Sequence, residues 1–266
     1  MQFTHVLPNG KEVQLKEILF KDLRTFNLYE DTSIRGKMEF LQSFILTKGL
    51  NVLEQFYALL YLRQNCIGDN IIVTSNKGDV GVSIDFIRKN LDGIPDVATT
   101  VNIDQAEYTL DIPYQFNAGD DDFILSLIKC IRIGDQTLDI PSLSKEEQQE
   151  VIERLPEQLY TAIDQYLNNT HEFFNLCLLD SIPGEVEINP IEFSILDGAF
   201  TVFIVSLFNC ITTRGYRELL FSLAKRINDV SFLANSTYLE VYDYFEMYTN
   251  EIQERNANQS GTPMGG

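Results

Sequence analysis

The sequence predicts an α+β protein that is mainly helical, with an N-terminal β-hairpin, an inserted antiparallel β-module and a long buried helix near residues 190–211. Three observations predict this class. Apolar residues recur at helical spacing over most of the chain, their spacing changes to two between residues 71 and 116, and one later stretch is apolar on nearly all sides.

These patterns suggest four regions along the chain. We expect an N-terminal hairpin with helices, an antiparallel β-insert, a helical region with a central buried helix, and a flexible tail, over residues 1–70, 71–118, 119–256 and 257–266.

The first region opens with alternating apolar residues on both sides of Pro8-Asn9-Gly10, which predicts a β-hairpin over residues 3–13. Helical patterns follow at residues 15–29, at residues 33–47 and from residue 51 onward. Asn51 and Glu54 have the spacing of a capping box at the start of the third helix.

The β-insert is predicted from alternation of apolar and polar residues. Strands are expected at residues 71–74, 80–86, 101–103 and 108–116, and together they would form one antiparallel module with one buried face.

Helical spacing then returns, first at residues 122–131. Gly134-Asp135 predicts a tight turn, Ser144 and Glu147 form a second capping-box pattern, and Pro156 suits the start of the next helix. A further hairpin is expected from strands at 174–179 and 186–188, and the last helices at 216–227 and 237–254.

The stretch from residue 189 to 211 predicts the central helix. Asn189, Pro190 and Glu192 have the pattern of a capped helix start. Apolar side chains then recur at helical spacing, at Phe193, Leu196, Phe200, Phe203, Leu207 and Ile211. A membrane-associated helix over residues 195–207 is the alternative, but this segment is too short to span a bilayer.

Residues that could carry chemistry are few and scattered. Cys66, Cys130, Cys177 and Cys210 lie far apart without a CxxC pair, so we expect four reduced, buried thiols and no metal site. The only histidines are His5 and His171. We expect no catalytic residue and no cofactor, although an enzyme or small-ligand binder with a non-standard site remains an alternative.

The 266-residue chain has a formal net charge of −19, which argues against a protein that binds the phosphate backbone of nucleic acid. Solubility accounts for much of this acidity, and the alternative is a steered encounter with a basic protein partner. Aromatic residues near the C-terminus, Tyr242, Phe245 and Tyr248, are the candidate anchors of such an interface. The alternative is that all three pack internally.

Four short motifs follow one another along the chain: L-P-N-G-K-E-V at residues 7–13, V-S-I-D-F at 82–86, L-S-K-E-E-Q-Q-E-V-I-E-R-L-P at 143–156 and E-F-S-I-L-D-G-A-F-T-V-F at 192–203. Their order resembles that in the baseplate hub proteins of T4-like contractile-tailed phages. The resemblance implies a non-enzymatic structural or assembly protein that binds other baseplate and tail proteins. It also implies a location in the virion tail, or in the host cytoplasm during assembly.

Two features depart from that family's pattern. Many relatives carry a CxxC in the β-insert, where this chain has Thr74-Ser75-Asn76-Lys77-Gly78, and many carry Trp-Glu-Arg near the end, whereas this chain has no Trp. A structural hub subunit and a more divergent assembly factor therefore both remain open.

Overall fold

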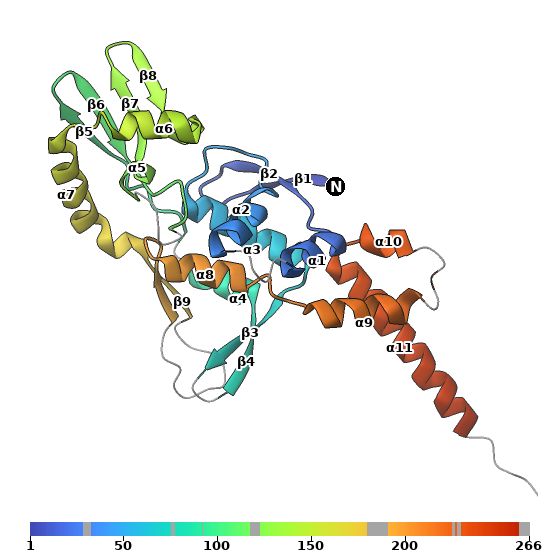
Figure 1. Ribbon diagram of the computed structural model, residues 1–266. Helices are drawn as coiled ribbons and strands as arrows, with labels where there is room; N and C mark the ends of the chain where they lie inside the picture. Colours follow the sequence, from blue (N-terminus) through green and yellow to red (C-terminus); the bar gives the residue numbers. More distant parts are fainter. Residues whose placement is uncertain are drawn as a thin grey trace, which may run out of the picture.

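The computed structural model describes residues 1–28, 33–75, 78–91, 93–117, 123–179, 191–224, 227 and 230–260 (Figure 1). The helices are α1 (Phe20–Leu28), α2 (Ile34–Gln42), α3 (Val52–Cys66), α4 (Ile84–Asn90), α5 (Phe123–Ser126), α6 (Lys145–Ile152), α7 (Glu157–Phe174), α8 (Gly198–Ser206), α9 (Thr213–Ala224), α10 (Val230–Ala234) and α11 (Tyr238–Ser260). The strands are β1 (Gln2–Val6), β2 (Glu12–Lys16), β3 (Asn70–Ser75), β4 (Gly78–Ser83), β5 (Thr99–Ile103), β6 (Ala106–Leu110), β7 (Ile128–Ile133), β8 (Gln136–Asp139), β9 (Asn175–Leu179) and β10 (Ile191–Ser194). The α+β class is confirmed.

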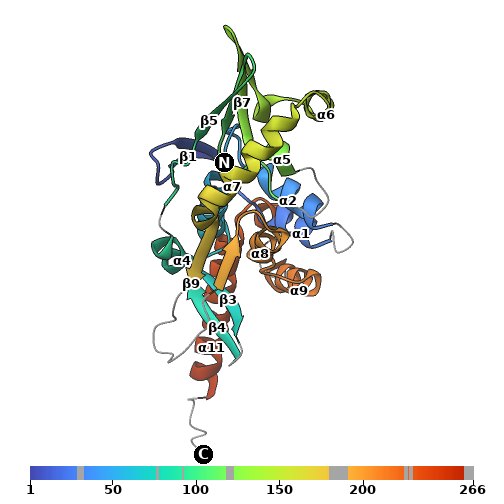
Figure 2. The same ribbon diagram turned by 90° about the vertical axis from the view of Figure 1, so that its left-hand side faces the viewer.

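The sheets are small and their strand pairs are antiparallel. β1 pairs with β2, β3 with β4 and β9 with β10, whereas β5, β6, β7 and β8 form one four-stranded sheet in chain order. In Figures 1 and 2 this larger sheet stands at one end of the molecule and α11 runs out at the opposite end. Because isolated two-stranded pairs are marginally stable, the helices must supply most of the core.

Helix α3 lies at the centre of the larger core. Twelve of its 15 residues are buried, and they lie on all sides of the helix. A helix buried all round needs other elements against every face, and this explains why hairpins and helices from distant parts of the sequence surround it. The centre of the fold is therefore α3, not the segment near residue 200.

The segment expected as one long helix over residues 190–211 divides into a strand and a shorter helix. Its start forms β10, which pairs with β9, and α8 begins only at Gly198 and ends at Ser206. Glu192 therefore lies in a strand, and Asn189 and Pro190 lie outside the described residues. The physical reason is that the first apolar side chains of this segment also alternate with period two, and β9 offers them a partner strand.

The expected burial of this segment is confirmed for one face of α8 only. Phe200 and Ile204 of α8, and Phe208 just after it, have no exposed surface, whereas Val202 on the other face is 48% exposed. The ring of Phe200 packs edge-on against Phe56 of α3, with ring centroids 5.0 Å apart. This contact joins α8 to the central helix.

The expected strands of the β-insert are wrong in several places. They do not form one module, since β3 and β4 form a sheet separate from β5–β8, and the strand expected at residues 108–116 ends at Leu110. Residues 84–86, expected as strand, begin helix α4, because the Ser83 hydroxyl accepts a hydrogen bond from the backbone N–H of Phe86 at 3.0 Å and caps the helix. Residues 122–131, expected as helix, contain only the short α5 before β7 begins, whose isoleucines suit a strand paired with β6. The larger sheet consequently extends from Thr99 to Asp139.

The N-terminal hairpin is fastened to the start of α3 through Glu54. The predicted capping box is present: Asn51 Oδ1 accepts from the Glu54 N–H at 2.9 Å, and Glu54 Oε2 accepts from the Asn51 N–H at 3.0 Å. From the hairpin turn, Asn9 Nδ2 donates to Glu54 Oε1 at 2.9 Å and Lys11 Nζ lies 3.0 Å from Oε2. Gly10 between them has φ 82°, a conformation that favours glycine.

Arg63 fastens the other end of α3. Its buried guanidinium donates from Nε to the Leu207 carbonyl at 2.7 Å, from Nη2 to the Asn70 carbonyl at 2.9 Å, and from Nη1 to the Gly68 carbonyl. Burial lowers the pKa of Arg63. One side chain thus joins the end of α3 to the end of α8 and the start of β3.

A second, smaller core gathers α1 and the C-terminal helices. Its buried residues are Phe20, Tyr216, Leu223, Leu233 and Val241. The rings of Phe20 and Tyr216 stack with centroids 4.2 Å apart. This cluster holds α9, α10 and the first turns of α11 against the N-terminal part of the chain.

The four cysteines are free thiols, but only Cys66 is buried, whereas Cys130, Cys177 and Cys210 are half-buried. The expectation that all four are buried is therefore wrong for three. Burial raises the pKa of the Cys66 thiol and of the Cys210 thiol to about 11, with Arg63 opposing the shift at Cys210.

Replacing Phe200 with Asp should prevent soluble folding. The change buries an unpaired carboxylate and removes an aromatic contact to α3, a combination expected to cost about 4 kcal/mol or more. Val202→Asp is the matched control, because Val202 lies on the same helix and is 48% exposed. Thermal melting of both variants tests this, and a Phe200→Asp protein that melts like wild type would contradict it.

Glu54→Ala should lower the melting temperature more than Glu147→Ala does. Both glutamates close capping boxes, but Glu147 is exposed, whereas the buried Glu54 also binds Asn9 and Lys11. Loss of a buried acceptor costs about 1–3 kcal/mol for each group left without a partner. Equal losses in calorimetry would show that the contacts to the hairpin contribute nothing.

Alkylation at pH 8 should modify Cys66 and Cys210 more slowly than Cys130 and Cys177. With a pKa of about 11, each of the first two thiols is only about 0.1% thiolate at that pH. Their rates should rise about tenfold per pH unit between pH 8 and 10. Peptide mass spectrometry measures each site, and fastest labelling of Cys66 in the native protein would refute the assignment.

Candidate functional site

The candidate interface lies on α11, the helix that leaves the body of the molecule (Figure 1). Its start is fixed: Thr237 Oγ1 accepts from the Glu240 N–H at 3.3 Å, and Glu240 Oε2 accepts from the Thr237 N–H at 2.7 Å. Val241 is fully buried in the smaller core. Beyond these turns the helix runs outward past α9, so its later turns present side chains away from the body (Figure 1).

The three residues expected at the interface have different surroundings. Tyr242 is 41% exposed, and its ring stacks on Tyr238 with centroids 6.1 Å apart. Phe245 is half-buried at the edge of the smaller core, and Tyr248 is half-buried one turn further along. The structure therefore places Tyr242 on the open surface and the other two along the packed stripe of the helix.

The structure shows a second apolar surface on α11, which the sequence did not predict. Phe232 of α10 and Tyr244 of α11 contact each other edge-on, with ring centroids 5.7 Å apart. They are 47% and 39% exposed, and Met247, one turn after Tyr244, is 63% exposed. We call Phe232, Tyr244 and Met247 the α10–α11 patch. Only the spacing of Tyr244 and Met247 could have indicated it, because the sequence does not reveal where α10 packs.

The charged residues of α11 are all acidic up to Glu254, and Arg255 follows. Between Tyr238 and Glu254 the helix carries the acidic residues Glu240, Asp243, Glu246, Glu251 and Glu254. No Lys, Arg or His occurs in that interval. Exposed aromatic rings flanked by carboxylates are suited to a partner that supplies apolar pockets and positive charge.

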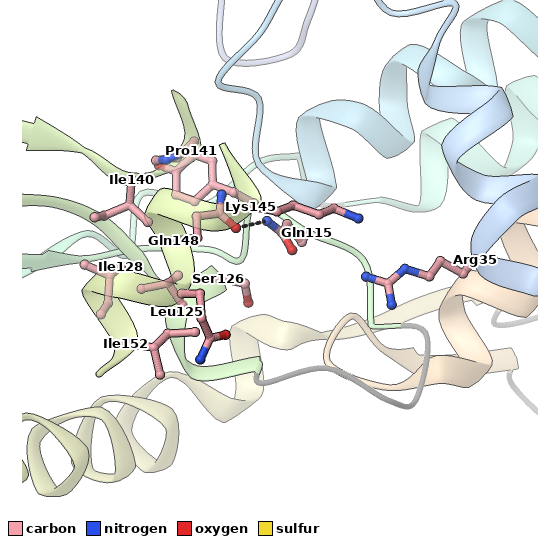
Figure 3. Close-up of a pocket in the computed structure, with 12 residues that line it drawn as sticks. Arg35, Gln115, Leu125, Ser126, Ile128, Ile140, Pro141, Lys145, Gln148 and Ile152 are labelled. Carbon is pink, nitrogen blue, oxygen red and sulfur yellow. Dashed lines mark hydrogen bonds between the residues drawn. The ribbon is translucent and has the colours of Figure 1, made fainter. Parts of the chain in front are cut away.

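A polar pocket lies between α2, α5, α6 and the loop after β6 (Figure 3). Arg35 reaches toward it from α2, and Gln115 donates to Gln148 across it at 3.2 Å. Its volume, about 180 Å³, is below the range typical of ligand sites, about 300–1,000 Å³.

Several polar side chains that line this pocket form ion pairs or hydrogen bonds with neighbouring residues. Arg35 and Lys145 both pair with Glu39, at 3.4 and 3.8 Å. Ser126 Oγ donates to the Phe123 carbonyl at 2.6 Å. The Tyr114 hydroxyl donates to Asp111 at 3.0 Å, and burial together with that carboxylate raises the pKa of Tyr114. The described lining contains neither Cys nor His, and the hydroxyls of Tyr114 and Ser126 donate to the acceptors named above.

Metal sites and membrane-spanning helices are two further classes of feature to consider. In the part of the chain that the structure describes, no three His, Cys, Asp or Glu side chains come together as metal ligands. None of the helices within the described ranges combines the length and the apolar character needed to cross a bilayer.

Comparison with known proteins assigns the family. A family model described as T4 bacteriophage base plate protein matches residues 1–174, which is 174 of 266 residues and ends with the last residue of α7. No curated protein and no solved structure matched the chain. The matched segment contains the N-terminal hairpin, the central helix α3 and the four-stranded sheet. The chain belongs to the T4 bacteriophage base plate protein family.

Proposed function

We propose that this baseplate protein is a subunit of the baseplate hub that works through protein–protein contacts and catalyses no reaction. Family membership supports a place in the phage tail and contact with other tail proteins. The hub in particular is supported by the order of motifs from the L-P-N-G-K turn to the passage at residues 192–203. Before incorporation the protein would reside in the host cytoplasm.

The observation that carries this proposal is the geometry of α11. A capped and buried first turn holds the helix rigidly, while later turns carry Tyr242, Tyr244 and Met247 on the surface. Aromatic and Met side chains are enriched at the centres of protein interfaces. A rigid helix that presents them loses little conformational entropy on binding.

Charge supports a basic baseplate protein as the partner and argues against nucleic acid. The carboxylates of α11 and the net charge of −19 attract a positive surface and repel a phosphate backbone. This attraction acts mainly on the association rate, and it is screened beyond about 8–10 Å at physiological salt. The affinity would then come from the apolar anchors.

Changing Tyr242, Tyr244 and Met247 together to Ala should abolish incorporation into baseplates without changing the melting temperature. Each side chain is more than one-third exposed, so the fold loses little, whereas each interface anchor contributes about 2 kcal/mol or more. The assay adds purified protein to an extract of infected cells that lack it, and counts infectious particles and assembled baseplates.

Ile72→Ala is the control, because Ile72 is an apolar residue, 76% exposed, on β3 and not on α10 or α11. It should assemble like wild type. Phe245→Ala with Tyr248→Ala tests the packed stripe: a lower melting temperature would assign these two residues to the fold, and native melting with lost assembly would add them to the interface. Normal incorporation of the triple variant would disprove the proposed role of α11.

A further inference from the structure

A second open surface lies at the opposite end of the molecule, between the four-stranded sheet and α6. The groove there has a volume of about 700 Å³. Tyr108, Ile131 and Leu138 form one row of its floor, since Ile131 lies opposite both of the others in the strand register. Ile133 continues this apolar face toward the tip of the sheet.

The outer part of this floor is uncovered. Tyr108 and Ile131 are 7% and 8% exposed, but Ile133 is 58% and Leu138 is 40% exposed. The apolar face of the sheet therefore extends further than α6 covers it. An uncovered apolar face that continues into a groove is typical of a surface that receives a partner.

The groove runs beside an edge strand. β8 is last in the sheet order, and among the described residues no strand pairs with its outer side. Alternate N–H and C=O groups of an edge strand point outward and can pair with an added strand. Every second side chain of the added strand would face the groove and lie next to Leu138.

The border of the groove is mainly acidic. Glu147 and Glu150 of α6 line it. Asp135 lies in the turn between two lining residues, Ile133 and Gln136. Arg154 is the basic residue of the lining. A second copy of the chain, with its net charge of −19, would bring like charges together here. A segment that carries Lys or Arg would instead be attracted.

We propose that the β8 edge and the groove beside it bind an extended, basic segment of another protein, which adds a strand to the sheet and inserts an apolar side chain over Ile133 and Leu138. This surface is separate from α11, and the two lie at opposite ends of the molecule (Figures 1 and 2). The protein would then connect two partners, one at each end.

The test uses the full chain and fluorescent peptides of about twelve residues, enough for a strand and its flanks. The probe alternates Lys and Val. One control peptide replaces Lys with Glu, and another carries Pro at two central positions, which removes N–H donors needed for strand pairing. Fluorescence anisotropy should show saturable binding of the probe and at least about tenfold weaker binding of both controls.

Two variants locate the binding. Ile133→Thr with Leu138→Thr removes the apolar anchors and keeps strand-forming residues, and Asp135→Lys with Glu150→Lys reverses the border charge. Each should weaken binding at least about tenfold. Glu146→Lys with Glu153→Lys is the matched control, since it makes the same charge change at the two ends of α6, at positions that do not line the groove.

Four results would overturn the proposal. The first is that the wild-type protein does not bind the probe saturably, and the second is that the proline peptide binds as tightly as the probe. The third is that the Thr variant binds the probe as tightly as wild type does. The fourth is that the Glu146→Lys, Glu153→Lys control loses as much affinity as the Asp135→Lys, Glu150→Lys variant. Sedimentation velocity tests whether a second copy of the chain occupies the groove instead. If the wild-type protein is a dimer and the variant with Thr at positions 133 and 138 is a monomer, the groove binds a second copy of this chain.

Discussion

The burial of α3 on all sides is the constraint on which the rest of the structure depends. A helix in that position must be joined at both ends to the elements that surround it, and two of its own side chains make these connections. Glu54 joins its start to the N-terminal hairpin, and Arg63 joins its end to α8 and β3. The L-P-N-G-K turn thus has a structural role, because Asn9 and Lys11 both bind the buried carboxylate of Glu54 in addition to its capping-box contact.

Local chemistry was sufficient to predict the elements that end in caps and turns. The hairpin around Gly10, the capping boxes at Asn51 and Ser144 and the helix that follows Pro156 are where the sequence placed them, whereas the cap pattern that included Glu192 is not a helix start. Strand pairing could not be predicted in this way. Residues 128–133 and 191–194 are apolar runs that suit a helix or a strand, and only their partners β6 and β9 decide between the two. The same limit applies to the interface, since the exposure of Met247 depends on where α10 and α11 pack.

The arrangement of surfaces agrees with a structural role in a baseplate. The matched family segment contains the central helix and the large sheet, and the C-terminal helices follow it. The apolar surfaces of α11 and of the sheet edge are far apart, and both are accompanied by carboxylates (Figure 1). A rigid body with one such surface at each end is suited to fix the distance between two neighbours in an assembly, a task that needs no catalytic group.

The most direct test of this account is carboxylate-to-lysine crosslinking of purified baseplates with a zero-length reagent, followed by mass spectrometry. If α11 is the docking element, carboxylates such as Asp243, Glu246 and Glu251 should crosslink to lysines of a different baseplate protein. Crosslinks from α11 that stay within this chain, with links to other baseplate proteins arising only from other surfaces, would contradict the account.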